Sequence, residues 1–296
     1  MNNFIVSGAS SMLGAAFCRL LEEKNKKILA LVRPDSKRLG AIPKSAEIAE
    51  SDISEIDKLK FNQRYDAFVH FAWANTYRED RLNPFKQYLN IEYALKSVEA
   101  AKNAGCSVFV FAGSQAEYGR AEGLINENYP LNADNAYGIC KNSASLLAKN
   151  LCSEYGIRYV HTRIFSVYGE YDTRDSLISK LILSLLKNER LKLTKCEQVW
   201  DYLYCGDCAE AFYLLSEKGA HGEAYNIGSG EAKRLSEYVN IVLSFFPGRQ
   251  ADIGGLPYSE NQVMNLRPDI SKLKALGFTV KTDFKAGIAK IIEHLK

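Results

Sequence analysis

The sequence has no hydrophobic run long enough to span a membrane, and it has little excess charge of either sign. Its 38 Lys and Arg residues stand against 35 Asp and Glu residues, which leaves a formal net charge of +3. So small a surplus, without a long basic run, argues against nucleic acid and against an anionic membrane surface as partners. The segment Met1–Gly8 also lacks the charged start and the cleavage site of a secretory signal.

Cysteine pairs and histidine clusters are missing too. The four histidines are scattered, without the spacing of metal ligands, and the seven cysteines are an odd number with mostly apolar neighbours. This usage favours buried free thiols in a reducing cytoplasm. Cys205 and Cys208 form a C-x-x-C, but the residues around them are typical of a helix and no second pair completes a zinc site. We therefore expect a cytoplasmic protein without a metal.

What the sequence does contain is an alternation of short apolar runs and longer helical patterns. The runs are rich in β-branched and aromatic residues, as expected of strands that are covered on both faces. We predict strands at Phe4–Val6, Ile28–Val32, Glu47–Ala49, Ala67–Phe71, Val108–Ala112 and Tyr159–Arg163. Helices are predicted at Leu13–Glu23, Pro84–Ala104 and Ala136–Tyr155. This order is typical of an α/β protein with a Rossmann-like, doubly wound parallel sheet.

After residue 168 the pattern changes to short strands and helices in mixed order. The 296 residues suit one large domain or two modest ones. We predict a dinucleotide-binding Rossmann domain over residues 1–168 and a smaller mixed α/β substrate-binding unit over residues 169–296. No linker separates them, so we expect the two parts to pack closely and a ligand to bind where they meet.

Glycines mark the turn between the first predicted strand and the first predicted helix. In a dinucleotide-binding turn of this kind, backbone amides and the helix N-terminus hold a pyrophosphate. Ser11 replaces the middle glycine of the motif, so an ordinary strand-to-helix turn also explains it. Because the turn lies in the first βα unit, we favour a cofactor site that comprises Gly8, Ser10, Ser11, Met12, Leu13 and Gly14.

The choice of cofactor depends on the residue that reads its ribose, about 20 residues beyond the glycines. A carboxylate there would bind the 2′-hydroxyl group of NAD, whereas an arginine would bind the 2′-phosphate of NADP. Arg33 stands at this place, which favours NADP over NAD, although an exposed basic loop is the plain alternative. Asp52 and Ile53 are candidates for contacts to the adenine; a helix cap at Asp52 explains them equally well.

Tyr137 and Lys141 lie four residues apart in a predicted helix, which places both side chains on one face. A nearby ammonium group and a cationic nicotinamide lower the pKa of a tyrosine, so that it can exchange a proton with a hydroxyl or carbonyl group. Ser114 follows a strand at its carboxyl end, where ligands bind on such sheets. It can hold the substrate oxygen by a hydrogen bond. A chance Y-x-x-x-K and a capping serine are the alternatives.

Several motifs also stand in a fixed order along the whole chain. They are Ser7-Gly8-x-x-Ser11-x-x-Gly14, His70-Phe71-Ala72-Trp73, Ser114 ahead of Tyr118-Gly119, Tyr137-x-x-x-Lys141, Arg163-Ile164-Phe165-Ser166-Val167-Tyr168-Gly169, Asp201-Tyr202-Leu203-Tyr204-Cys205-Gly206-Asp207, Tyr225-Asn226-Ile227-Gly228 and Arg267-Pro268-Asp269. With these motifs the sequence resembles the extended short-chain dehydrogenase/reductase family, in its nucleotide-sugar epimerase/dehydratase branch.

The resemblance implies an NAD(P)-dependent oxidoreductase that acts on a nucleoside-diphosphate sugar. By that resemblance Tyr137 is the acid/base, Lys141 binds the nicotinamide ribose, and Ser114 polarises the sugar oxygen. Phe71 and Ala72 are expected to line the cofactor site. A homodimer built on the two long helices of the first domain is also implied.

The resemblance is looser for the residues that bind the substrate. Ser166 stands where an asparagine commonly contacts the sugar nucleotide, and Trp200 replaces an arginine often found before Asp201. Both departures leave the identity of the sugar open. Arg174 and Arg267 are candidates for the diphosphate, because a guanidinium group suits it.

Three activities fit this family. Its dehydratases usually carry Thr-Asp-Glu where this chain has Ser114-Gln115-Ala116, so a 4,6-dehydratase is disfavoured. We predict a 4-keto-sugar reductase, because Arg33 favours NADPH, with an NAD-dependent 4-epimerase as the alternative. A protein that binds a dinucleotide as a sensor, without catalysis, is a further hypothesis. Such proteins typically lose the tyrosine or the lysine that this chain keeps at Tyr137 and Lys141.

Overall fold

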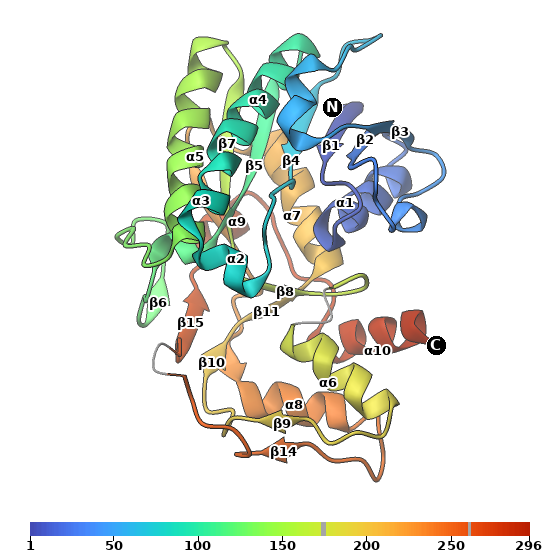
Figure 1. The fold of residues 1–296 in the computed structure, drawn as a ribbon, viewed down its shortest axis with the longest axis vertical. Coiled ribbons are helices and arrows are strands. Elements are labelled where there is room, and N and C mark those ends of the chain that lie inside the picture. The colour runs from blue at the N-terminus through green and yellow to red at the C-terminus, as the bar shows by residue number, and fades with distance from the viewer. Residues whose placement is uncertain (173–175, 260–261) are drawn as a thin grey trace.

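The computed structural model describes residues 1–172, 176–259 and 262–296. Its centre is a seven-stranded parallel sheet with the strand order β12-β7-β5-β4-β1-β2-β3 (Figure 1). The strands are β1 (Asn3–Ser7), β2 (Lys27–Val32), β3 (Glu47–Glu50), β4 (Ala67–His70), β5 (Val108–Ser114), β7 (Arg158–Ile164) and β12 (Ala224–Ile227). All six predicted strands are present in this sheet, so the predicted α/β, Rossmann-like fold is confirmed.

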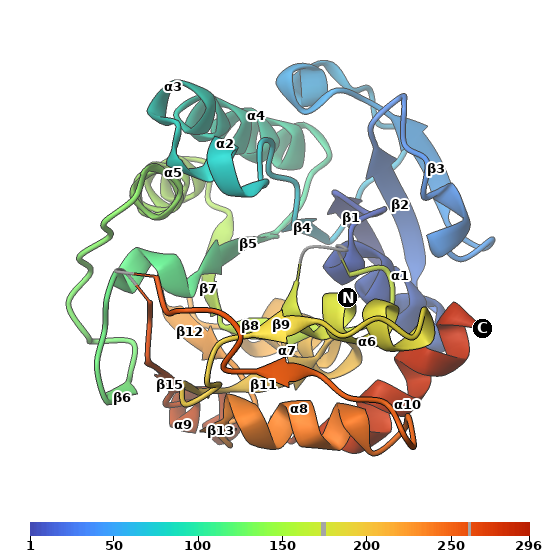
Figure 2. The same ribbon diagram turned by 60° about the horizontal axis from the view of Figure 1, so that its bottom comes forward.

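Helices cover both faces of the sheet (Figure 2). One face packs against α4 (Leu89–Asn103) and α5 (Ala136–Glu154), the other against α1 (Met12–Glu23) and α7 (Cys205–Lys218). The alternation of side chains along β1 sends Phe4 and Val6 into the core beneath α1 and α7, and Ile5 into the core beneath α4 and α5. All three side chains are fully buried, which explains why the strand is an unbroken apolar run.

The segment after β4 differs from the prediction of one helix over Pro84–Ala104. The structure has α3 (Pro84–Gln87) and then α4, with Tyr88 between them. Tyr88 keeps helical angles (φ −61°, ψ −29°), so the break is local. The sequence does not predict the short helix α2 (Arg78–Leu82) before α3, nor the 3₁₀ helices η1 (Leu39–Ala41) and η3 (Gln115–Tyr118). The 3₁₀ helix η2 (Ile53–Lys58) follows the helix cap that the sequence offers at Asp52.

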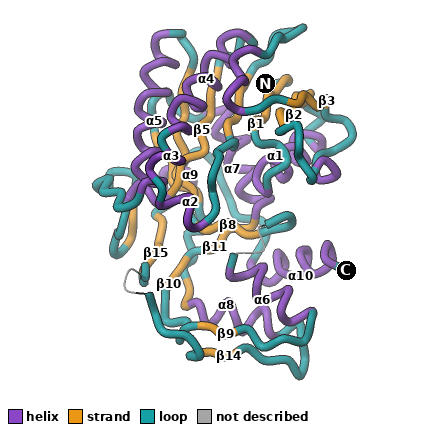
Figure 3. Tube along the Cα trace, viewed as in Figure 1, coloured by secondary structure: helices purple, strands orange, loops and turns teal. Residues whose placement is uncertain are grey.

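Small sheets and helices lie beyond the carboxyl ends of the sheet strands (Figures 1 and 3). The helices there are α6 (Leu177–Leu186), α8 (Leu235–Leu243) and α10 (Phe284–Leu295), whereas the short α9 (Ser271–Ala275) packs beside β12 of the central sheet. Four short strands form the order β13-β10-β15-β6, and two further pairs are β11-β8 and β14-β9. Their bounds are β6 (Leu124–Ile125), β8 (Ser166–Tyr168), β9 (Lys192–Leu193), β10 (Val199–Trp200), β11 (Tyr202–Tyr204), β13 (Lys233–Arg234), β14 (Asp252–Ile253) and β15 (Asn265–Pro268).

The chain returns to the central sheet twice after residue 168. α7 packs against α1, and β12 pairs in parallel with β7 as the edge strand of the sheet. The sheet layer therefore takes residues from both predicted units. The division of the chain into a dinucleotide-binding unit before residue 169 and a substrate-binding unit after it stays a prediction.

The described residues also settle where the cysteines lie. All seven thiols are free and buried, and Cys205 and Cys208 belong to α7, as the helical pattern around them predicts. Within residues 1–172, 176–259 and 262–296, no three His, Cys, Asp or Glu side chains are grouped so that they could hold a metal ion. In the same residues, no helix combines the length and the apolar character that a membrane span requires.

Candidate active site

The turn between β1 and α1 forms a cradle at the carboxyl edge of the sheet. Gly8 has φ of +68°, which favours glycine, and a Cβ atom there would clash with the backbone of Ala72. A Cβ atom on Gly14 would clash with the carbonyl oxygen of Gly8. Ser11 caps α1 by accepting a hydrogen bond of 3.1 Å from the amide of Gly14. Met12 and Leu13 are the first residues of α1, so their backbone amides lie at the helix N-terminus. Such amides could donate hydrogen bonds to the pyrophosphate of a dinucleotide.

Neighbouring strands border this cradle. The amide of Phe71 donates to the carbonyl oxygen of Ser7 at 3.1 Å, which brings the end of β4 beside the end of β1. The hydroxyl of Ser10 accepts a hydrogen bond of 2.9 Å from Ser36, which follows β2. The ends of β1, β2 and β4, at which the predicted cofactor residues stand, are therefore brought to one place, where the strand order reverses.

Arg33 and Asp52 lie at the ends of β2 and β3. Arg33 is exposed, and its guanidinium lies 3.8 Å from the carboxylate of Asp35. Asp52 caps η2, which begins at Ile53, by accepting hydrogen bonds of 2.9 Å and 2.6 Å from the amide and hydroxyl of Ser54. These hydrogen bonds hold the pKa of Asp52 below its ordinary value, and Arg33 adds to the effect. The capping interpretation therefore accounts for Asp52.

Ser114 and Tyr137 meet at the end of β5. Ser114 is the last residue of the strand and caps η3, while Tyr137 lies in the first turn of α5. Gly138 permits this contact, because a Cβ atom there would clash with the carbonyl oxygen of Ala116 in η3. Burial raises the pKa of the half-buried Tyr137 phenol, and hydrogen bonding from Ser114 lowers it in part.

Lys141 lies one turn further along α5 and is almost fully buried. Its ammonium donates a hydrogen bond of 2.7 Å to the carbonyl oxygen of Ala112 and lies 3.7 Å from the centre of a Trp73 ring. The centre of the Tyr137 ring is 5.9 Å away. Burial lowers the pKa of Lys141 to about 7, and nearby Glu117 opposes that change. The predicted trio of Ser114, Tyr137 and Lys141 is thus assembled at one strand end.

Arg81 is a second cation at this phenol. It belongs to α2, and its guanidinium carbon lies 4.0 Å from the centre of the Tyr137 ring. From the sequence alone, Arg81 could line the sugar cleft or simply lie on a surface loop or helix, and the surface interpretation is favoured. The structure places it over the phenol, because α2 packs against α5.

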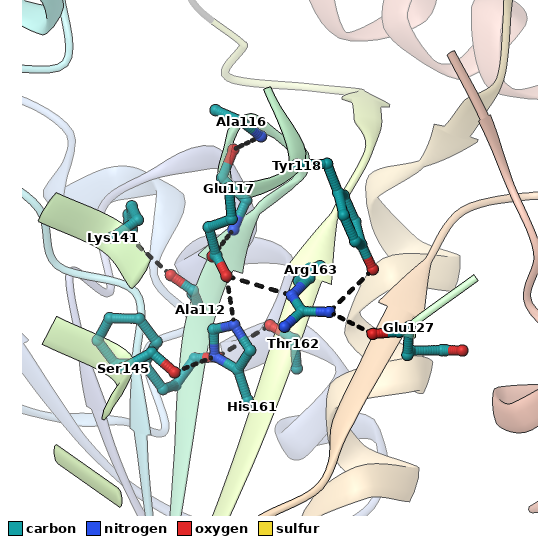
Figure 4. A network of polar contacts seen from close by, with 12 residues as sticks. Ala112, Ala116, Glu117, Tyr118, Glu127, Lys141, Ser145, His161, Thr162 and Arg163 are labelled. Atoms are coloured by element: carbon teal, nitrogen blue, oxygen red, sulfur yellow. Dashed lines mark hydrogen bonds and ion pairs between the residues drawn. The ribbon is translucent and has the colours of Figure 1, made fainter. Parts of the chain in front are cut away.

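A buried polar cluster is built around Glu117, with His161 and Arg163 as its partners (Figure 4). Glu117 is fully buried and accepts hydrogen bonds from the Ser114 amide at 2.8 Å, His161 Nε2 at 2.7 Å and Arg163 Nε at 3.2 Å. Burial by itself would raise the pKa of Glu117. His161, Arg163 and the Ser114 amide outweigh burial and hold that pKa below its ordinary value. The cluster fixes the backbone of Ser114.

Gly113 leaves the room that this cluster needs. A Cβ atom on Gly113 would clash with the carbonyl oxygen of Thr162, with the His161 ring and with the Glu117 carboxylate. Arg163 also donates to the Tyr118 hydroxyl at 3.0 Å and to the Glu127 carbonyl oxygen at 2.9 Å, so its charge is surrounded by acceptors.

The sequence offers a partial signal for this cluster. β7 is a buried strand, yet His161 and Arg163 stand two residues apart in it and so share one face. Buried groups that can carry a positive charge need a buried acid as partner. Glu117 is the acid, but only the pairing of β5 with β7 brings it there. Nothing in the sequence indicates that Arg81 meets Tyr137, and Trp73 is visible only as part of the motif His70-Phe71-Ala72-Trp73.

The predicted substrate residues lie at different places. Ser166 begins β8, two residues beyond Ile164, which pairs with Ser114 across the sheet, so it lies at the same edge as the trio. Arg267 is exposed on β15, next to β6 and β10. Arg174 lies outside the described residues. The contacts of these three with a substrate stay predictions.

Relatives of this chain are found along nearly its full length. The uncharacterized UDP-glucose epimerase YtcB of Bacillus subtilis is 26% identical over 98% of this chain and 97% of its own. A putative UDP-glucose 4-epimerase of Methanocaldococcus jannaschii is 28% identical over 99% and 98%. The solved UDP-glucose 4-epimerase of Thermus thermophilus, in complex with NAD, has a TM-score of 0.87 at 21% identity, with 98% of both chains covered, and so shares the fold.

The family itself follows from a match along most of the chain. Residues 4–228 match the model of the NAD dependent epimerase/dehydratase family. That stretch contains the glycine turn, the end of β5 and both residues of the Tyr137–Lys141 pair, so the resemblance drawn from the motifs is confirmed. The chain belongs to the NAD dependent epimerase/dehydratase family and is an extended short-chain dehydrogenase/reductase enzyme.

Proposed function

We propose that the protein is an NAD-dependent 4-epimerase of a nucleoside-diphosphate sugar. The observation that carries this proposal is the meeting of Ser114, Tyr137 and Lys141 at the end of β5, in the same sheet edge as the Gly8 cradle. Two relatives that match over nearly the whole chain are named as UDP-glucose epimerases. The epimerase alternative is therefore favoured over the 4-keto-sugar reductase predicted from the sequence.

Each of the three residues has one task in this proposal. NAD, when bound at the cradle, supplies the acceptor and the later donor of a hydride at a sugar ring carbon. Tyr137 takes the proton of the hydroxyl group at that carbon and later returns it. Ser114 holds the same oxygen by a hydrogen bond, and Lys141 places a positive charge beside the ribose and the phenol.

A dehydratase lacks its acid at this site. Gln115 and Ala116 follow Ser114 and carry no carboxyl group. The next residue, Glu117, is fully buried and already accepts hydrogen bonds from His161 and Arg163. It is thus committed to the fold, so the elimination of water has no free carboxyl donor in this segment.

A 4-keto-sugar reductase that uses NADPH is the second candidate. It is favoured by the exposed Arg33 at the end of β2, because a guanidinium there would pair with a 2′-phosphate. Asp35, 3.8 Å away, weakens that preference, since its carboxylate already shares the guanidinium charge.

Interconversion of sugar nucleotides tests the proposal directly. Purified protein is incubated with UDP-glucose, UDP-galactose and the matching dTDP, GDP and CDP sugars, with and without NAD⁺. We expect two 4-epimers to interconvert with no net change in cofactor. Consumption of NADPH on a 4-keto-6-deoxy sugar nucleotide, with no interconversion of unoxidised sugars, would instead establish the reductase.

The homodimer and the cytoplasm also stay proposals. Phe85 on α3 and Ile139 and Leu146 on α5 are exposed apolar side chains, which support an interface along these helices. Free, buried cysteines throughout support a reducing compartment. The molar mass in solution, measured by light scattering, tests the dimer.

A further inference from the structure

Arg81 faces the phenol that the proposed reaction uses. Its guanidinium carbon lies 4.0 Å from the centre of the Tyr137 ring, and its positive charge lowers the pKa of the phenol against the effect of burial. Arg81 is half-buried, and no ion pair joins it to an acid anywhere in the described residues. An arginine that has no acid to neutralise it, and that lies on a candidate acid/base, calls for a role of its own.

The segment that carries Arg81 is fastened to the fold. Gln87 is fully buried; its amide donates to the carbonyl oxygens of Asn75 at 2.7 Å and Asp80 at 3.0 Å, and accepts from the Trp73 indole at 2.9 Å. These bonds tie the segment before α2, and Asp80 within α2, to the end of α3. Arg81 is therefore held over the phenol by buried contacts and is not a free surface side chain.

Arg81 and Lys141 carry their charges differently. Lys141 donates to the Ala112 carbonyl oxygen, and burial lowers its pKa to about 7. Without cofactor or substrate, the lysine is therefore charged for only part of the time near neutral pH. A guanidinium group keeps its charge at every pH a protein tolerates.

Three charged groups face the phenol from the elements packed around it. They are Arg81 from α2, Lys141 from α5 itself and Glu117 from η3. Glu117 opposes the phenolate form, but its charge is already matched by Arg163. Arg81 is thus the permanent cation that favours an ionised Tyr137.

We infer that Arg81 is a positioning residue that stabilises the phenolate of Tyr137 and so sets the pH range in which the enzyme can remove the sugar hydroxyl proton. The inference rests on the proposed function. In that step the sugar O–H bond breaks and the phenol O–H bond forms, while the C–H bond at the same carbon breaks and a C=O group is left; NAD⁺, held at the Gly8 cradle, would accept the hydride. The guanidinium takes no proton; it lowers the energy of the anion that accepts one.

The test compares Arg81→Met with Arg81→Lys and with a matched control. Lys86→Met removes a cation from the same corner of the molecule, in an exposed pair with Asp80 that does not touch the phenol. We expect Arg81→Met to lower kcat about tenfold near neutral pH and to leave kcat close to the wild-type value in alkali. The acid limb of its pH profile should move to higher pH by about one pH unit. KM should change little, Arg81→Lys should restore most of the profile, and Lys86→Met should leave it unchanged.

Each other outcome overturns the inference. If the pH profile of Arg81→Met is unchanged, Arg81 does not stabilise the phenolate. An equal loss of kcat at every pH would indicate structural damage only. A rise in KM alone would indicate that Arg81 binds the substrate instead. If wild type turns over no sugar nucleotide, the proposed function fails and the Arg81 question is still answered. Phenolate absorbance of NAD⁺-loaded protein, taken as wild type minus Tyr137→Phe, should then shift to higher pH in Arg81→Met; no shift refutes the inference.

Discussion

Two polar clusters share the carboxyl end of β5, and they differ in how their charges are paired. In the first, the buried acid Glu117 is held by Arg163 and His161. In the second, the buried Lys141 donates to the Ala112 carbonyl oxygen, and no ion pair to an acid is present for it within the described parts of the chain. The clusters are neighbours, because Ser114 contributes its backbone to one and its side chain to the other.

The difference separates a cluster that maintains the fold from one that is available for chemistry. Burial lowers the pKa of Lys141 to about 7, whereas cationic partners keep the pKa of Glu117 below its ordinary value in spite of burial. A buried charge with matched partners resists titration. An unmatched one costs folding free energy and responds to whatever binds beside it.

The largest effect on the second cluster is expected from Tyr137→Phe. The variant keeps the ring, which packs edge-on against Trp73, and removes the oxygen that we propose exchanges the proton. We expect turnover to fall by roughly 10³-fold while NAD⁺ binding is retained. Steady-state rates and calorimetric titration of NAD⁺ measure the two quantities. Tyr155→Phe, at the far end of α5, is the control; comparable turnover in both variants would remove Tyr137 from the chemistry.

The first cluster is broken by Glu117→Gln, which leaves the buried Arg163 without its acid. We expect the free energy of unfolding in urea to fall by about 3–5 kcal/mol. Glu223→Gln breaks an exposed pair with Lys272 and should cost less than about 1 kcal/mol. Equal small losses in both variants would show that the buried pair does not stabilise the fold.

Acid should reduce the difference between wild type and Glu117→Gln. The pKa of Glu117 is lower in the folded protein than its ordinary value, so its contribution is complete above the unfolded pKa. It is lost as the pH falls through the folded pKa.

The opposite sign is expected for Lys141→Met. The folded pKa of Lys141 is about 7 against an ordinary 10.5, so the unfolded chain binds a proton that the folded chain lacks across this range. Wild-type stability therefore rises with pH through that window. We expect the variant to be more stable than wild type by about 1–3 kcal/mol near neutral pH, less so in alkali, and inactive. A destabilised Lys141→Met protein would contradict the comparison.

The smallest effect is expected from Trp73→Leu. The indole face offers the Lys141 ammonium a contact at 3.7 Å, and such a contact stabilises a cation by roughly 0.5–2 kcal/mol. Its loss should lower the pKa of Lys141 further, as observed in an NMR titration of the lysine side chain. Trp73→Phe keeps an aromatic face, so the pKa of Lys141 in this variant should lie between its values in wild type and in Trp73→Leu. An unchanged lysine pKa in Trp73→Leu would show that the aromatic contact is immaterial.

The sequence predicts the second cluster much better than the first, for a physical reason. Tyr137 and Lys141 share a helix face through their spacing, and Ser114 ends a strand, so local patterns locate all three. Glu117 and Arg163 are 46 positions apart and meet only through the register of β5 and β7. Periodicity carries no information about that register when both strands are buried on both faces.

The same limit applies to the fold. Each buried strand is visible as an apolar run, but a run does not say which sheet it joins. The strand at Ala224–Ile227 is visible in the sequence after the predicted boundary at residue 168, yet it pairs with β7. Arg81 is a further case, because the course of the chain after β4 is set by the buried amides of Gln87 and Asn90.

The position of β12 has a consequence for how the protein is made. During synthesis, β7 leaves the ribosome well before its neighbour, since residues 165–223 lie between them. Until β12 arrives, β7 presents an open strand edge, of the kind to which other chains add. A nascent or truncated chain that ends near residue 168 should therefore aggregate unless a chaperone binds it. Only a chain that has been made past β12 can cover the edge of β7 with its own strand.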